Sequence, residues 1–161
     1  MTDINPQQGR VMALDLGEKR IGVAISDTTR TIATPHSVLK RTSRAADFAH
    51  YARLIADHGI TLLVIGLPIT LGGQEGQRAA WVRDYAAGLA EHVATPITFW
   101  DESLTTVEAT AALHAQGRRG KQVKERVDAV AAALILQSYL DAQRPDAQRP
   151  DAQRPENLYE E

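Results

Sequence analysis

A chain of 161 residues, 43% of them hydrophobic and 24% charged, is long enough for one folded domain with its own core. It contains no cysteine, which excludes disulfides, thiolate metal sites and cysteine nucleophiles. Its net charge of −2 is uneven, because residues 141–161 carry three arginines against six acids and leave residues 1–140 with a net charge of +1. A surface that binds nucleic acid therefore requires clustered positive charge.

No apolar run approaches the roughly 20 residues that a membrane-spanning helix needs. The polar start of the chain also lacks the charged and then apolar pattern of a signal peptide. We therefore expect a cytoplasmic protein, with residues 1–9 as a flexible N-terminus.

Three strands are predicted in the first 40 residues. Residues 11–16 and 21–26 are apolar and flank a short turn that begins with Gly17, where a positive φ would close a tight hairpin. The third strand, over 33–39, contains Pro35, which places it at an edge of the sheet or at a strand start.

A helix is predicted to begin after Ser43, which can cap it, and to end at Gly59, with Phe48, Ala52 and Ile55 on its apolar face. Residues 62–65 form a continuous apolar run, which is typical of a strand covered on both faces in a mixed or parallel sheet. A second helix is predicted over 77–92.

The C-terminal half continues the alternation. A strand over 97–100 ends at Asp101, a helix over 105–116 starts with the capping-box spacing of Thr105 and Glu108, and an alanine-rich helix covers 122–140. This order predicts an α/β fold, with a central mixed sheet of about five strands flanked by helices.

After residue 140 the sequence DAQRP occurs three times, up to residue 155. Each copy contains a proline and little apolar surface. We therefore predict a folded domain over 10–140 and a disordered tail over 141–161.

Three acids occupy positions where burying a carboxylate is costly or where a strand end can direct it toward a ligand. Asp15 lies inside an apolar strand, Glu102 follows a strand end beside Asp101, and Asp128 lies in the most apolar helix. A buried carboxylate costs several kcal/mol unless it is paired or bound to a cation. Mg²⁺ and Mn²⁺ prefer oxygen ligands. The pattern predicts an ion site formed by Asp15, Asp101, Glu102 and Asp128, suited to phosphodiester hydrolysis.

Each acid also has a structural interpretation. Asp15 can serve the turn before Gly17, and Asp101 or Glu102 can complement the positive end of the next helix. Asp128 can pair with Lys124, four residues earlier, or face solvent. No single acid decides between the two interpretations, and only the placement of all the acids together favours an ion site for phosphodiester hydrolysis.

Basic residues lie next to two of the acids in the sequence. They can neutralise backbone phosphates, although charged loops are more often simply solvated. Trp81 and Trp100 are predicted to be core residues. The predicted substrate-binding residues are Lys19, Arg20, Arg118, Arg119, Lys121 and Lys124.

Four segments, MALDLGEKRIGVAISD, GLPITLGGQEGQRA, WDESLTTVEA and KERVDAVAAALILQSYLD, resemble in order the blocks of the YqgF (RuvX) family of pre-16S rRNA nucleases, also described as Holliday-junction-resolvase-like. The resemblance covers about residues 10–140. It implies a ribonuclease H-like fold, divalent-metal phosphodiester hydrolysis, and trimming of the 5′ end of small-subunit ribosomal RNA.

Carried over by block, the family's acids fall on Asp15, Glu102 and Asp128, which we expect to be catalytic, with Mg²⁺ or Mn²⁺ as cofactor. Lys19 and Arg20 match the first block. Position 103 is Ser, where the family commonly has Arg. The implied partners are structured RNA or branched DNA and pre-ribosomal particles, bound by a monomer or homodimer.

Three other functions compete with the RNA nuclease. They are a Holliday junction or branched-DNA resolvase, a non-catalytic RNA-binding module, and a nucleotide binder related to actin and the sugar kinases. Nucleotide binders of that class clamp ATP between two domains, for which a body of about 140 residues is short.

Overall fold

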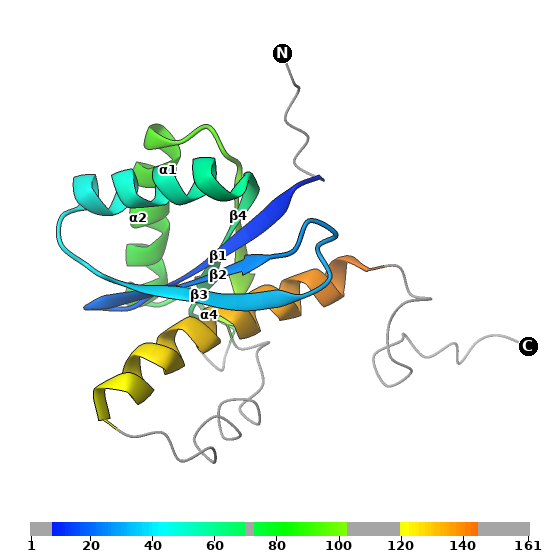
Figure 1. The fold of residues 1–161 in the computed structure, drawn as a ribbon. Coiled ribbons are helices and arrows are strands. Elements are labelled where there is room, and N and C mark those ends of the chain that lie inside the picture. Colours follow the sequence, from blue (N-terminus) through cyan, green and yellow to red (C-terminus); the bar gives the residue numbers. More distant parts are fainter. Residues whose placement is uncertain (1–7, 70–72, 103–119, 145–161) are drawn as a thin grey trace, which may run out of the picture.

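The computed structural model describes residues 8–69, 73–102 and 120–144, with only the backbone of 120–126 (Figure 1). A five-stranded sheet has the order β3-β2-β1-β4-β5. The elements are β1 (Arg10–Leu16), β2 (Arg20–Ser26), β3 (Ala33–Lys40), α1 (Arg44–His58), β4 (Ile60–Leu67), α2 (Gln77–His92), β5 (Ile97–Asp101) and α4 (Gly120–Gln143).

The sheet is mixed, as predicted. β1, β2 and β3 pair antiparallel, whereas β4 is parallel to both β1 and β5. Pro35 lies in β3, the edge strand, where a missing backbone N–H is tolerated. β4 lies between two strands and is buried along nearly its whole length, which confirms the interpretation of its apolar run.

Helices cover both faces of the sheet, with α1 and α2 on one face and α4 on the other (Figure 1). Strand residues alternate between the two resulting cores. Met12 and Leu14 of β1 belong to the core under α1 and α2, whereas Val11 and Ala13 belong to the core under α4. Asp15 follows the second set and therefore points to the α4 face. No helix in the described ranges is long and apolar enough to cross a bilayer.

Helix α1 begins and ends at the predicted residues. The Ser43 hydroxyl accepts a hydrogen bond from the backbone N–H of Ala46 at 3.1 Å, and Gly59 ends the helix with φ of 64°. The predicted apolar face is only partly right, because Asp47, Phe48, Tyr51 and Leu54 are the buried residues.

Asp47 is buried because it has partners in the core. Its carboxylate accepts hydrogen bonds from the Tyr85 hydroxyl at 3.1 Å and from the backbone N–H of Thr42 at 3.3 Å. The hydroxyls of Tyr51 and Tyr85 are 2.9 Å apart. These contacts offset the cost of burying the carboxylate and turn this side of α1 toward α2.

The hairpin between β1 and β2 is present, but the reason given for Gly17 is wrong. Gly17 does not have a positive φ. A side chain there would instead meet the backbone, because a Cβ atom would lie 2.5 Å from the carbonyl oxygen of Arg20. The backbone N–H of Gly17 donates to that same oxygen at 2.9 Å, which closes the turn.

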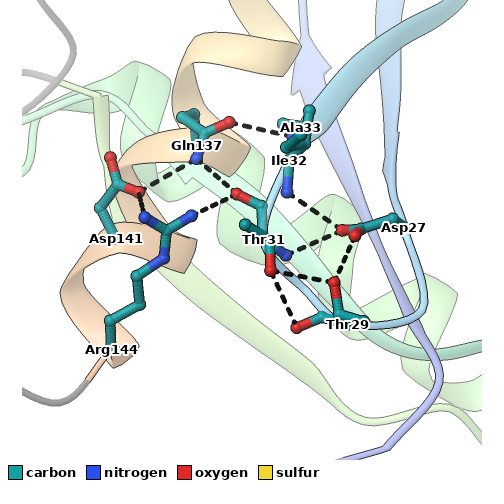
Figure 2. A network of polar contacts seen from close by, with 8 residues as sticks. All are labelled: Asp27, Thr29, Thr31, Ile32, Ala33, Gln137, Asp141 and Arg144. Atoms are coloured by element: carbon teal, nitrogen blue, oxygen red, sulfur yellow. Dashed lines mark hydrogen bonds and ion pairs between the residues drawn. The ribbon is translucent and has the colours of Figure 1, made fainter. Parts of the chain in front are cut away.

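The C-terminal end of α4 is tied to the loop between β2 and β3 (Figure 2). The Gln137 amide donates to the carbonyl oxygen of Thr31 at 2.9 Å and to Asp141 at 3.0 Å. Arg144 pairs with Asp141 at 3.4 Å and also donates to the carbonyl oxygen of Thr31. Asp27 stabilises the loop by accepting the N–H of Thr31 at 2.8 Å. α4 thus ends at Gln143, three residues later than predicted, because the first repeat contributes these contacts.

Candidate active site

Two of the predicted acids meet at the edge of the sheet where parallel strands end, and a third approaches from α4. Asp15 is the penultimate residue of β1, and Glu102 directly follows β5. Both strands are parallel to β4, so their carboxyl ends share one edge. Asp128 lies in α4, on the face to which Asp15 points.

Gly22 allows α4 to approach the sheet beside Asp15. Gly22 is paired with Asp15 across the β1–β2 ladder. A Cβ atom on Gly22 would lie 1.9 Å from the carbonyl oxygen of Asp128, a distance that no side chain tolerates. The backbone of α4 at Asp128 therefore rests directly on the strand next to Asp15. A glycine inside an otherwise apolar strand is the sequence signal of such an approach.

Glu102 is placed in the same way by Gly66 of β4. A Cβ atom at Gly66 would lie 3.0 Å from Oε1 of Glu102 and 2.7 Å from Cδ1 of Ile135 in α4. The Glu102 carboxylate thus lies over β4, the strand that neighbours β1. It also forms a side-chain hydrogen bond with Asp15.

The electrostatics of Asp15 reflect this crowding. Burial is the largest of the causes that raise the pKa of Asp15 to about 7, followed by the charge of Glu102 and the hydrogen bond with it. The charge of Asp128 raises the pKa further, and Arg78 opposes the shift. Near neutral pH one proton therefore stabilises the pair of carboxyl groups, a role that a bound cation can take over.

Asp128 has a partner that its own helix did not suggest. Its Oδ2 accepts a hydrogen bond from Nε of Arg20 at 2.7 Å, an ion pair between groups 38% and 29% exposed. Arg20 was predicted to bind substrate. The structure shows that it also holds the carboxylate of Asp128, and that both groups keep access to solvent.

A divalent cation fits the chemistry of this group only in part. Asp15 and Glu102 supply adjacent carboxylate oxygens, the donors that Mg²⁺ and Mn²⁺ prefer. In the described ranges, however, no three acidic or histidine side chains are arranged closely enough to hold one ion. Asp128 instead pairs with Arg20.

Asp101 does not join the group. Ile97 and Phe99 of β5 pack against the core under α1 and α2, whereas Trp100 packs under α4. Strand alternation therefore directs Asp101 to the face opposite Asp15.

The predicted basic residues are described unevenly. Lys19 is exposed in the turn that follows Asp15. Lys121 and Lys124 lie in the first turns of α4, where the structure describes only the backbone. Arg118 and Arg119, together with Ser103 and the helix predicted over 105–116, lie outside the described residues.

Sequence reasoning missed Arg78, although its position carried a signal. It lies in the first turn of α2, the helix that follows β4, and donates a hydrogen bond to the carbonyl oxygen of Leu16. Residues that follow the carboxyl ends of strands in open α/β sheets commonly contact ligands. Trp81, one helical turn later, packs against the core as predicted, and so does Trp100, whose Nε1 donates to Ser138 at 2.9 Å.

Residues 9–142 match a protein family described as "RuvX: Holliday junction resolvase". A protein of Roseiflexus sp. (strain RS-1), named "Putative pre-16S rRNA nuclease", is 42% identical over 141 residues, which cover 88% of this chain and all of that protein. A protein of the same name from Paracoccus denitrificans (strain Pd 1222) is 44% identical over 139 residues, covering 86% of this chain and 88% of that protein.

Two solved structures share the fold at low sequence identity. The RuvC of T. thermophilus in complex with a Holliday junction substrate is 14% identical, with a TM-score of 0.53 over 81% of this chain and 94% of that one. The yeast mitochondrial Holliday junction resolvase Ydc2 is 14% identical, with a TM-score of 0.50 over 86% of this chain and 80% of that one. The ribonuclease H-like fold predicted from the sequence is thereby confirmed.

Proposed function

This chain belongs to the RuvX family, and on that basis we propose that it is a nuclease that hydrolyses phosphodiester bonds, with the 5′ end of pre-16S rRNA as its substrate in ribosome biogenesis. The contact between the carboxyl groups of Asp15 and Glu102, with Asp128 beside them, carries the proposal. The names of the relatives support the choice of RNA and imply pre-ribosomal particles as partners.

The proposed roles follow from the positions of the acids. Asp15 and Glu102 are the catalytic carboxylates that would hold Mg²⁺ or Mn²⁺, and Asp128, paired with Arg20, is the third catalytic acid and approaches from α4. The ion, when bound, supplies positive charge that activates water and stabilises the leaving oxygen. Because Asp15 lies at the end of a buried strand, its carboxylate is held in one place before substrate binds.

Arg20 acts through Asp128 in this proposal. The ion pair fixes the direction of the Asp128 carboxylate, and the exposed part of the guanidinium can contact a phosphate. Lys19 is exposed on the adjoining turn and supplies further positive charge. Arg118, Arg119, Lys121 and Lys124, which the sequence predicts as substrate-binding residues, are the further cations that we propose for phosphate contacts.

A branched DNA junction is the second candidate substrate. It is favoured by the description of the matching family and by the likeness of the fold to a RuvC bound to a Holliday junction. RNA and DNA substrates differ in the 2′-hydroxyl and in groove shape. A direct comparison of substrates therefore decides between them.

The experiment compares cleavage of an RNA that spans the pre-16S 5′ processing site, a single-stranded DNA and a four-way junction. Each is incubated with Mg²⁺, Mn²⁺ or a chelator. We expect cleavage of the RNA only with metal present, and none by Asp15→Asn. The matched control is Asp57→Asn, an exposed acid on α1, which should cleave as the wild type does. Equal cleavage by the wild type, Asp15→Asn and Asp57→Asn would mean that the activity comes from a contaminating nuclease, and this result would refute the proposal.

A further inference from the structure

Two arginines reach the turn between β1 and β2 from elements far away in the sequence. Arg78 of α2 donates to the carbonyl oxygen of Leu16, the residue after Asp15. Arg41 follows β3, and its Nη1 donates to the carbonyl oxygens of Gly17 at 3.1 Å and Glu18 at 2.8 Å. Both guanidinium groups therefore lie beside the catalytic edge, which is the edge of the sheet that carries Asp15 and Glu102.

The indole ring of Trp81 lies close to both of these cations. The guanidinium carbon of Arg41 is 4.4 Å from the ring centroid, and that of Arg78 is 5.9 Å from it. Stacking on an aromatic face restricts a guanidinium group without neutralising its charge. Two positive charges are thus held near one another by neutral groups, the indole ring and backbone carbonyls.

Neighbouring arginines form ion pairs, whereas Arg41 and Arg78 form none with any residue that the structure describes. Arg44 pairs with Asp84 at 3.1 Å, and Arg83 pairs with Glu75 at 2.6 Å. Within the described ranges, no carboxylate lies within 4 Å of the guanidinium of Arg41 or Arg78. Positive charge in excess therefore accumulates at the end of α2 that is nearest to Asp15.

Arg41 is also held at a cost. Its Nε is buried and finds no hydrogen-bond acceptor in the part of the chain that the structure describes. A buried hydrogen-bond donor without a partner destabilises a protein. Packing alone therefore gives a poor account of this residue, whereas an anion would compensate the charge that Arg41 and Arg78 share.

We propose that Arg41, Arg78 and Trp81 form a phosphate-binding surface on the α2 side of the catalytic edge, for the backbone of the nucleic-acid strand being cleaved. This inference rests on the proposed function. Planar guanidinium groups match the oxygens of a phosphate. The nucleic-acid strand then crosses the sheet edge that carries Asp15 and Glu102, from the α4 side to the α2 side. On the way it passes the β1–β2 turn, which carries Lys19.

The test is a binding measurement with cleavage switched off. A labelled single-stranded RNA oligonucleotide is titrated with Asp15→Asn protein in chelator, and Kd is measured by fluorescence anisotropy over a range of salt. Adding Arg78→Gln should raise Kd about tenfold, and should lower the slope of log Kd against log salt by about 0.7, the value for one phosphate contact on a single strand. Arg83→Gln is the control in the same helix, and it should change neither quantity because Glu75 already neutralises that charge.

A structural role for Arg78 would lower the melting temperature without changing the salt slope. Equal slopes for Arg78→Gln and Arg83→Gln, or no RNA binding by the parent protein, would overturn the inference. If Arg78→Gln does not fold, Arg41→Gln removes the other charge of the same surface, and an unchanged Kd and salt slope in that variant would also overturn the inference. A changed slope without any cleavage by wild type would refute the nuclease alone and leave the phosphate surface standing.

Discussion

The contact between Gly22 and α4 gives a sharp prediction for Gly22→Ala. The added methyl group would lie 1.9 Å from the carbonyl oxygen of Asp128 if nothing moved. Contacts of this kind do not fall below 3.0 Å, so α4 or β2 must shift by about 1 Å. The same shift moves Asp128 away from Asp15, the residue that pairs with Gly22 in the β1–β2 ladder.

The expected cost has two parts. Overpacking a core costs about 1–3 kcal/mol, which for a domain of this size lowers the melting temperature by roughly 3 to 12 °C. A displacement of about 1 Å at a catalytic group can lower the rate about a hundredfold. Gly22→Ala should therefore remain folded at 20 °C and cleave far more slowly than its lost stability explains.

Urea unfolding and single-turnover cleavage measure these two effects separately. Gly76→Ala is the matched control, because a Cβ atom there would have nothing within 4 Å. It should change stability by less than about 1 kcal/mol and leave cleavage as in wild type. Wild-type stability and cleavage in Gly22→Ala would refute the close packing of α4 on the sheet and, with it, this geometry of the site.

Arg20→Gln should lower cleavage roughly 10- to 100-fold, because Asp128 loses the group that orients it. The free energy of unfolding should fall by no more than about 1 kcal/mol, because the ion pair is partly exposed. Cleavage at the wild-type rate would contradict this role of Arg20. Backbone hydrogen bonds from the β2–β3 loop hold the pKa of Asp27 at about 2, below its ordinary 3.8, so its stabilising contribution is complete above about pH 4 and is lost as the pH falls through 2. Asp27→Asn should therefore be less stable than wild type at pH 7 in urea unfolding, and a constant difference down to pH 2 would exclude this cause. Mg²⁺ or Mn²⁺ at 100 times its Kd should stabilise wild type by about 2.7 kcal/mol in thermal unfolding and Asp15→Asn by much less, whereas equal shifts would place the ion elsewhere.

Elements set by local chemistry could be predicted from the sequence. Ser43 and Gly59 mark the two ends of α1 because a cap and a left-handed C-terminus need only their own neighbours. Pro35 marks the edge strand for a similar reason, since it lacks the backbone N–H that an inner strand uses.

Contacts between distant segments could not be predicted in this way. The packing of α4 on β2 brings Arg20 to the carboxylate of Asp128 from 108 residues away, and the spacing of residues along α4 does not indicate this pair. Asp47 is a charged residue that would be placed on the solvent face of α1, and its burial depends on a hydroxyl from α2.

The candidate site contains residues of both kinds, some predictable from the sequence and some not. Asp15 and Glu102 could be expected to meet, because strand ends share an edge once the sheet is parallel. The sequence alone does not show which of Asp101 and Glu102 lies on the same face as Asp15. That depends on which residues of β5 point to each face of the sheet. Arg78 was missed because its signal, a position just after the carboxyl end of β4, indicates Asp15 as its neighbour only once the strand order is known.

Single-turnover cleavage of the pre-16S RNA by Asp15→Asn, at protein concentrations well above Kd, tests the central claim most directly. We predict a rate at least about a hundredfold below that of Asp57→Asn, with RNA affinity equal in the two variants and Asp15→Asn no less stable, because the substitution removes a buried charge. A rate in Asp15→Asn within a few fold of that control would contradict the assignment of the catalytic site to the edge where Asp15, Glu102 and Asp128 lie.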